Sequence, residues 1–190
     1  MGGTHDEARE KGSASADGHV RHARNLDYMG VGHWDQEAAV LFYAPDEGQP
    51  YVSISSAGVP LGGITAMNQS GLTLAVHQHL GCLDFELGGM PVGLIGDQVM
   101  RHAHSLSEAC AILDGHRPNG GWTYLVASAT ENAILCYEVT AARRAWKIAT
   151  KPSSRPNGSA VHLQWSSEFF SAKQHCQRLL NRVVVSEWER

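Results

Sequence analysis

Short apolar runs broken by turn residues dominate the chain from Gly18 to Gln78. These runs alternate with polar positions and are separated by turn sequences such as PDEGQP and NQSG. A two-residue period rich in β-branched and aromatic residues is typical of strands, and short turns connect antiparallel neighbours. The pattern predicts five antiparallel strands in the segments HVRHARNL, AAVLFYA, YVSISSA, GITAMN and LTLAVHQ.

The hydrophobic period changes near Pro91. Between residues 92 and 114, apolar residues recur at helical spacing in two segments, and Ser105 with Glu108 forms a capping-box pattern between them. We therefore expect two helices that pack on the sheet. Strand patterns resume in WTYLVASA, NAILCYEV and AWKIAT. Strands, then two helices, then strands again predict an α+β fold and not alternating βαβ units.

The composition divides the chain into three parts. Residues 1–17 are polar and rich in Gly, Ser, Ala and charge, which predicts a disordered leader. Residues 18–150 carry the strand and helix patterns of one domain. Residues 151–190 begin with the Pro/Ser/Gly-rich sequence KPSSRPNGS, which predicts a linker before a helical C-terminal segment. A chain of 190 residues with 43% hydrophobic content suits one core of ordinary domain size.

Charge and hydropathy restrict the partners. The net charge is −4, charged residues make up 18% of the chain, and no Lys/Arg-rich run is present. The sequence therefore gives no electrostatic support for binding nucleic acid or an anionic membrane. No apolar run is long enough for a membrane span or a signal peptide. We expect a cytoplasmic protein that acts on small molecules, and a homo-oligomer remains open.

Cysteine and histidine spacing predicts neither a disulfide framework nor a metal site. Reduced and mostly buried thiols are expected, because no CxxC spacing occurs among Cys82, Cys110, Cys136 and Cys176. His77 and His79 would share one face of a strand, but no carboxylate cluster completes a ligand set beside them. No metal or organic cofactor is expected.

Four segments carry a family resemblance. They are, in chain order, ADGHVRHARNLDY, GITAMNQSGLTLAVHQH, GMPVGLIGDQVMRHAHSLSEACAIL and GGWTYLVASATENAILCYEV. Together they resemble the middle portion of the acyl-CoA:6-aminopenicillanate acyltransferase family, the C45-type cysteine peptidases related to choloylglycine hydrolase. The resemblance implies an incomplete N-terminal-nucleophile (Ntn) fold, which is a four-layer αββα sandwich. It also implies cleavage or exchange of amide and ester bonds through an N-terminal cysteine exposed by self-cleavage.

The resemblance assigns catalytic roles to Arg24, Asp27 and Gln78. Arg24 and Asp27 would fix the nucleophile and its amine, since arginine offers a permanent charge and ionised aspartate only accepts hydrogen bonds. Gln78 would donate its carboxamide protons to the oxyanion. Residues three apart on a regular strand point to opposite faces, so the chain would have to bend, and Asn25 suits such a bend. The alternative is a surface Arg–Asp pair of little energetic value.

Three further positions are interpreted less specifically. Asn68, in MNQSG, is expected to be a turn residue, and the alternative is a residue that touches the site. Gln164 is the nearest match to a further asparagine of the family. Trp34 either lines an acyl pocket or fills the core.

The resemblance fails at the nucleophile. The position of the family's cysteine falls between His5 and Ala8, and no cysteine precedes Cys82, which is itself expected to pack as a small apolar residue. Thr4 is either a replacement nucleophile or an ordinary leader residue. Two function classes follow. One is an amide hydrolase or acyltransferase acting on an N-acyl amide or acyl thioester; the alternative is a catalytically inactive truncated chain or pseudoenzyme that keeps the fold and a ligand pocket.

Overall fold

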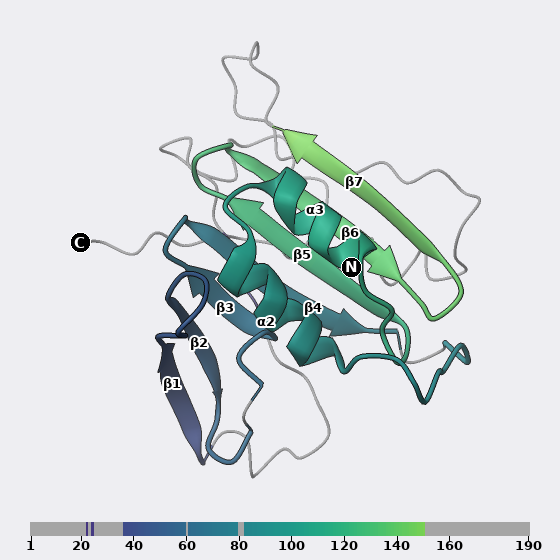
Figure 1. Cartoon of the computed structure of the whole chain (residues 1–190), viewed down its shortest axis with the longest axis horizontal. Coiled ribbons are helices and arrows are strands. Elements are labelled where there is room, and N and C mark those ends of the chain that lie inside the picture. The colour runs from purple at the N-terminus through teal and green to yellow at the C-terminus, as the bar shows by residue number, and fades with distance from the viewer. Residues whose placement is uncertain (1–21, 23, 25–35, 60, 80–81, 151–190) are drawn as a thin grey trace, which may run out of the picture.

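One antiparallel sheet with helices on one of its faces forms the structure, a computed structural model that describes residues 22, 24, 36–59, 61–79 and 82–150. The described sheet has seven strands, and their spatial order is their chain order. Figure 1 shows α2 and α3 lying side by side across the sheet. The elements are β1 (Ala38–Tyr43), β2 (Tyr51–Ser56), β3 (Thr65–Asn68), β4 (Leu72–Gln78), α2 (Val92–His102), α3 (Leu106–Asp114), β5 (Trp122–Ser128), β6 (Ala133–Val139) and β7 (Arg144–Thr150).

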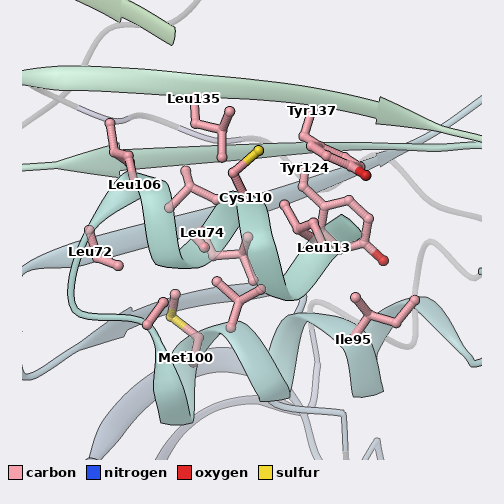
Figure 2. Close-up of a cluster of buried hydrophobic side chains, with 14 of the residues drawn as sticks. Leu72, Leu74, Ile95, Met100, Leu106, Cys110, Leu113, Tyr124, Leu135 and Tyr137 are labelled. Atoms are coloured by element: carbon pink, nitrogen blue, oxygen red, sulfur yellow. The ribbon is translucent and has the colours of Figure 1, made fainter. Parts of the chain in front are cut away.

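The hydrophobic core lies between the sheet and the two helices. Leu74 is directly opposite Val126, and Val126 is directly opposite Leu135, so the three side chains share the helix-facing side of β4, β5 and β6. Figure 2 shows Leu74 and Leu135 converging with Leu113 of α3, and each of these leucines is almost completely buried. Burying one such side chain stabilises the fold by roughly 1.5–3 kcal/mol.

The N-terminus of α3 follows the capping pattern. Ser105 is the N-cap residue, and its hydroxyl accepts a hydrogen bond from Glu108 N at 3.2 Å. The Glu108 carboxylate accepts from His104 N at 2.7 Å, one residue before the donor that a standard capping box uses. The predicted start of the second helix is confirmed, with this one-residue shift in the reciprocal bond.

Asn68 closes the β3–β4 turn and also holds the C-terminus of α2. Its Oδ1 accepts from Leu72 N at 3.0 Å, as expected of a turn residue. Its Nδ2 donates to Met100 O at 3.1 Å and to Ala103 O at 2.9 Å, and Gln49 Nε2 donates to Ala103 O at 2.7 Å. These amides satisfy carbonyls at the helix end that have no partner within the helix.

Two glycines allow α2 to lie against the chain before β3. A Cβ on Gly96 would overlap the carbonyl oxygen of Gly63, and a Cβ on Gly63 would overlap the backbone nitrogen of Asp97. Both positions therefore need glycine for close backbone approach. This contact sets the height of α2 over the sheet.

The α+β fold predicted from the sequence is confirmed. The strands expected between Ala38 and Gln78 and after Gly121 are present, as are both helices. The first predicted strand lies largely outside the described residues, as do the leader and the C-terminal segment. Free thiols are confirmed at Cys82, Cys110 and Cys136, of which the last two are buried. None of the described helices is both long and apolar enough to cross a membrane.

Candidate functional site

A row of polar side chains crosses the helix-free face of the sheet. His77 of β4 is directly opposite Thr123 of β5, which is directly opposite Glu138 of β6. Residues paired in this way share a face, and their position in the strand alternation places them away from the helices. Thr123 is only 3% exposed and Glu138 only 4%. A buried polar row is costly unless its members are hydrogen-bonded, so this face is specialised and not simply apolar.

His79 extends this row beyond the end of β4. Its Nε2 lies 2.6 Å from Thr123 Oγ1, and its backbone N donates to Gly121 O at 2.9 Å. The hydroxyl of Thr123 therefore has a side-chain partner within the row. Among the described residues no group of three or more His, Cys, Asp or Glu could hold a metal ion.

His22 and Arg24 bind to the same strand. His22 Nδ1 lies 2.8 Å from Thr73 Oγ1, and Arg24 Nη2 donates to the carbonyl oxygen of Val76 at 2.7 Å. Both side chains are half-buried. His22 and Arg24 thus each contact β4 through their side chains.

His22 and Arg24 differ in charge at neutral pH. Burial and, to a smaller extent, the neighbouring charge of Arg24 together lower the pKa of His22 to about 4. At neutral pH the imidazole is therefore uncharged, while the guanidinium of Arg24 keeps its charge. Positive charge at this part of β4 comes from Arg24.

Gln78 is the last residue of β4 and is exposed. It lies two positions after Val76, whose carbonyl binds Arg24, and it is directly opposite Trp122. In the strand alternation Gln78 falls on the helix-facing side with Leu74 and Trp122, opposite to His77, and the described part of the chain offers its carboxamide no hydrogen bond. Whether Arg24 and Gln78 face one cavity stays a prediction.

Of the remaining residues singled out from the sequence, the structure describes Cys82 but not the other four. Asp27, Trp34, Gln164 and Thr4 lie outside the described residues, so the closeness of Arg24 and Asp27 stays a prediction. Cys82 is half-buried and packs against Gly121, where an added Cβ would lie 2.7 Å from both its Cβ and its Sγ. Its thiol is in a packing position, as expected from the sequence.

Sequence reasoning missed four residues of this face: His22, Thr73, Thr123 and Glu138. The i, i+2 spacing of His22 and Arg24 was a usable signal, because it places both side chains on one side of an extended chain. For Glu138, the sequence shows a charged residue within an apolar strand pattern. It does not show whether that residue is buried, because burial of each face depends on the whole sheet.

The antiparallel sheet, the two helices on one face, the buried polar row and the arginine bound to the backbone of β4 define an α+β protein with a candidate site on β4. A model of the family described as acyl-coenzyme A:6-aminopenicillanic acid acyl-transferase matches residues 15–177, and the chain belongs to this family. The matched range includes Arg24, Asp27 and Gln78. A search of curated proteins finds no match to the chain.

Proposed function

We propose that the chain has the fold of an enzyme for nucleophilic acyl transfer, an amide hydrolase or acyltransferase that acts on a small N-acyl amide or acyl thioester. The observation that carries the proposal is the position of Arg24 within the family match. Its half-buried side chain binds the carbonyl of Val76 on a central strand, two residues before the exposed carboxamide of Gln78. A fixed cation and a free amide donor near one strand end suit a reaction that develops an oxyanion.

In the proposed reaction, the thiol of an N-terminal cysteine attacks the substrate carbonyl, and its proton passes to the α-amine of the same residue. A carbon–sulfur bond forms, the bond to the leaving amine or thiol breaks, and the α-ammonium returns the proton to the leaving group. Water or an acceptor amine then releases the acyl group. Arg24 and Asp27 hold the nucleophilic residue, and Gln78 stabilises the oxyanion, where one donor contributes about 3 kcal/mol.

We further propose that the described sheet is one half of an Ntn αββα sandwich. Large apolar side chains on the helix-free face support this: Val40 is 57% exposed, Phe42 84% and Ile54 53%. Val40 and Ile54 are directly opposite each other on β1 and β2, so they form a continuous apolar surface. A second layer over this face would remove that surface from water.

A second candidate function is a non-catalytic member of the family that keeps the fold and a ligand pocket. Positions 5–8, where the family's cysteine falls, are His, Asp, Glu and Ala. Of the described cysteines, Cys82 packs against Gly121 and Cys110 and Cys136 are buried. These observations favour a chain without a working thiol.

Four single variants test the two candidates: His5→Cys, Asp6→Cys, Glu7→Cys and Ala8→Cys. If the site is competent, one variant loses the residues before the new cysteine, which intact-mass spectrometry detects. The same variant then turns over a chromogenic N-acyl or thioester substrate. Adding Arg24→Ala to it lowers turnover on the order of 100-fold, because positioning and proton transfer contribute at this scale.

Ser13→Cys is the matched control, since it introduces the same thiol at a spacing that does not fit. It should neither self-cleave nor show turnover. If all four test variants keep the native circular dichroism spectrum and melting temperature but remain uncleaved and inactive, the acyl-transfer proposal is wrong and the non-catalytic function stands.

A further inference from the structure

The attachment of residues 22 and 24 to β4 needs more than the arginine. Arg24 has a long side chain with many rotamers, so contacts at the guanidinium end restrict the backbone at residue 24 only loosely. His22 has a short side chain with two rotatable bonds, and it meets Thr73 Oγ1 at 2.8 Å where both side chains are half-buried. The His22–Thr73 contact therefore restricts the backbone at residue 22 more closely than the Arg24–Val76 contact restricts it at residue 24.

Thr73 is well suited to hold His22. It is half-buried on the helix-free face, directly opposite Met67 on one side and Ala127 on the other. Its β-branched side chain has a restricted χ1, so the hydroxyl direction is defined. Its neighbours Leu72 and Leu74 are buried in the core on the opposite face, which fixes the strand beneath it.

We propose that Thr73 is a positioning residue, whose hydroxyl holds His22 and thereby keeps Arg24 at the carbonyl of Val76. A neutral imidazole suits this contact, because it can donate to or accept from a hydroxyl according to its tautomer. It also places no second positive charge beside Arg24. The importance of this positioning for acyl transfer rests on the proposed function, whereas the positioning itself does not.

Tryptic cleavage of the Arg24–Asn25 bond measures the attachment directly. Trypsin must take the Arg24 side chain into its own binding pocket, so Arg24 has to leave Val76 first. The cleavage rate then reports the population of molecules in which Arg24 is detached from Val76, when detachment and reattachment are fast. Thr73→Val keeps the shape of the side chain and removes the hydroxyl, and Thr73→Ser keeps the hydroxyl. His22→Phe removes the same contact from the other side.

Thr65→Val is the matched control. Thr65 lies on the same face of the neighbouring strand, directly opposite Ala75, and its hydroxyl has no hydrogen bond with a described residue. We expect Thr73→Val and His22→Phe each to accelerate cleavage about three- to tenfold, the effect of losing one hydrogen bond. Thr73→Ser and Thr65→Val should stay within about twofold of the original chain.

The double variant His22→Phe/Thr73→Val separates positioning from a general loss of stability. If Thr73 acts through His22, the double variant is cleaved no faster than either single variant, because the two changes remove one contact. Multiplying effects, or an unchanged rate in Thr73→Val, would overturn the proposal. Should Thr73→Val fail to fold, the other two variants decide the proposal. Faster cleavage in His22→Phe with a rate within about twofold of the original chain in Thr73→Ser supports it, and an unchanged rate in His22→Phe overturns it. Cleavage needs no acyl-transfer activity, so an inactive chain leaves this test intact.

Discussion

Tyr51 of β2 donates its hydroxyl proton to the carboxylate of Asp97 on α2. The bond joins the sheet to the helix across the close approach of Gly63 and Gly96. Tyr51 also stacks on Tyr43, with ring centroids 4.5 Å apart and an angle of 5° between the planes. Burial and the bond to Asp97 both raise the pKa of Tyr51, so the hydroxyl stays protonated and remains a donor.

Tyr51→Phe should lower the free energy of unfolding by about 1–2 kcal/mol, because it removes a hydrogen bond to a charged acceptor and leaves the ring stack intact. Urea denaturation at pH 7 measures the change. Tyr43→Phe is the control, since the Tyr43 hydroxyl has no hydrogen bond to a described residue, and its effect should stay within about 0.5 kcal/mol. Equal effects of the two changes would contradict the role given to the Tyr51–Asp97 bond.

Asn68→Ala should cost more than 2 kcal/mol, on the scale of about 1 kcal/mol for each hydrogen bond lost. The buried carboxamide donates to Met100 O and Ala103 O and accepts from Leu72 N. Thermal and urea unfolding would measure the loss. The adjacent Gln69 is exposed, and Gln69→Ala should be close to neutral. A loss below about 0.5 kcal/mol in Asn68→Ala would show that water replaces these bonds.

Gly96→Ala should destabilise the protein even though alanine has the higher helix propensity by about 1 kcal/mol. The new methyl group would overlap the carbonyl oxygen of Gly63, so α2 would have to move from the sheet. Gly115 at the end of α3 is the matched control: its φ of −73° is helical, and the nearest atom to an added Cβ is 3.4 Å away. We expect Gly115→Ala to be tolerated, and a more stable Gly96→Ala would disprove the close approach.

Acid should weaken the fold through His22. Its pKa in the folded chain is about 4, below the ordinary value of 6.5, so the unfolded chain binds the proton more readily. Stability from this group is therefore complete above pH 6.5 and declines as the pH falls toward 4, by up to about 3 kcal/mol. In His22→Phe the decline over this interval should be smaller, as measured by urea unfolding at several pH values. Parallel stability curves for both proteins would rule out this contribution.

Sequence periodicity predicted the elements well and their contacts poorly. Strands such as Leu72–Gln78 and helices such as Val92–His102 have local signals, because alternation and helical spacing show in neighbouring residues. The His22–Thr73 contact joins residues 51 apart, and the Arg24–Val76 bond joins residues 52 apart. Such pairings depend on how the whole sheet is assembled, which no local pattern contains. The resemblance identified Arg24, but the strand that binds it became visible only in three dimensions.

The final prediction concerns the activity of the 190-residue sequence without an introduced cysteine. Amide or thioester hydrolysis should stay at background, and self-cleavage should be absent. In the proposed chemistry the nucleophile and the base amine belong to one residue, so losing it removes both contributions together, and these are not additive. Oxyanion stabilisation by Gln78 would then have no covalent adduct to act on.

Thr4 provides the critical test of that prediction, because threonine with a free α-amine can replace cysteine in this chemistry. Cleavage after Gly3 would expose the Thr4 amine, whereas removal of Met1 alone would leave Gly2 in front. Intact-mass spectrometry distinguishes the two products. A mass that begins at Thr4, together with turnover of an N-acyl or thioester substrate that disappears in Thr4→Ala but persists in Ser13→Ala, would contradict the prediction. The chain would then be an active threonine enzyme, and Arg24 would be expected to hold Thr4 in place of a cysteine.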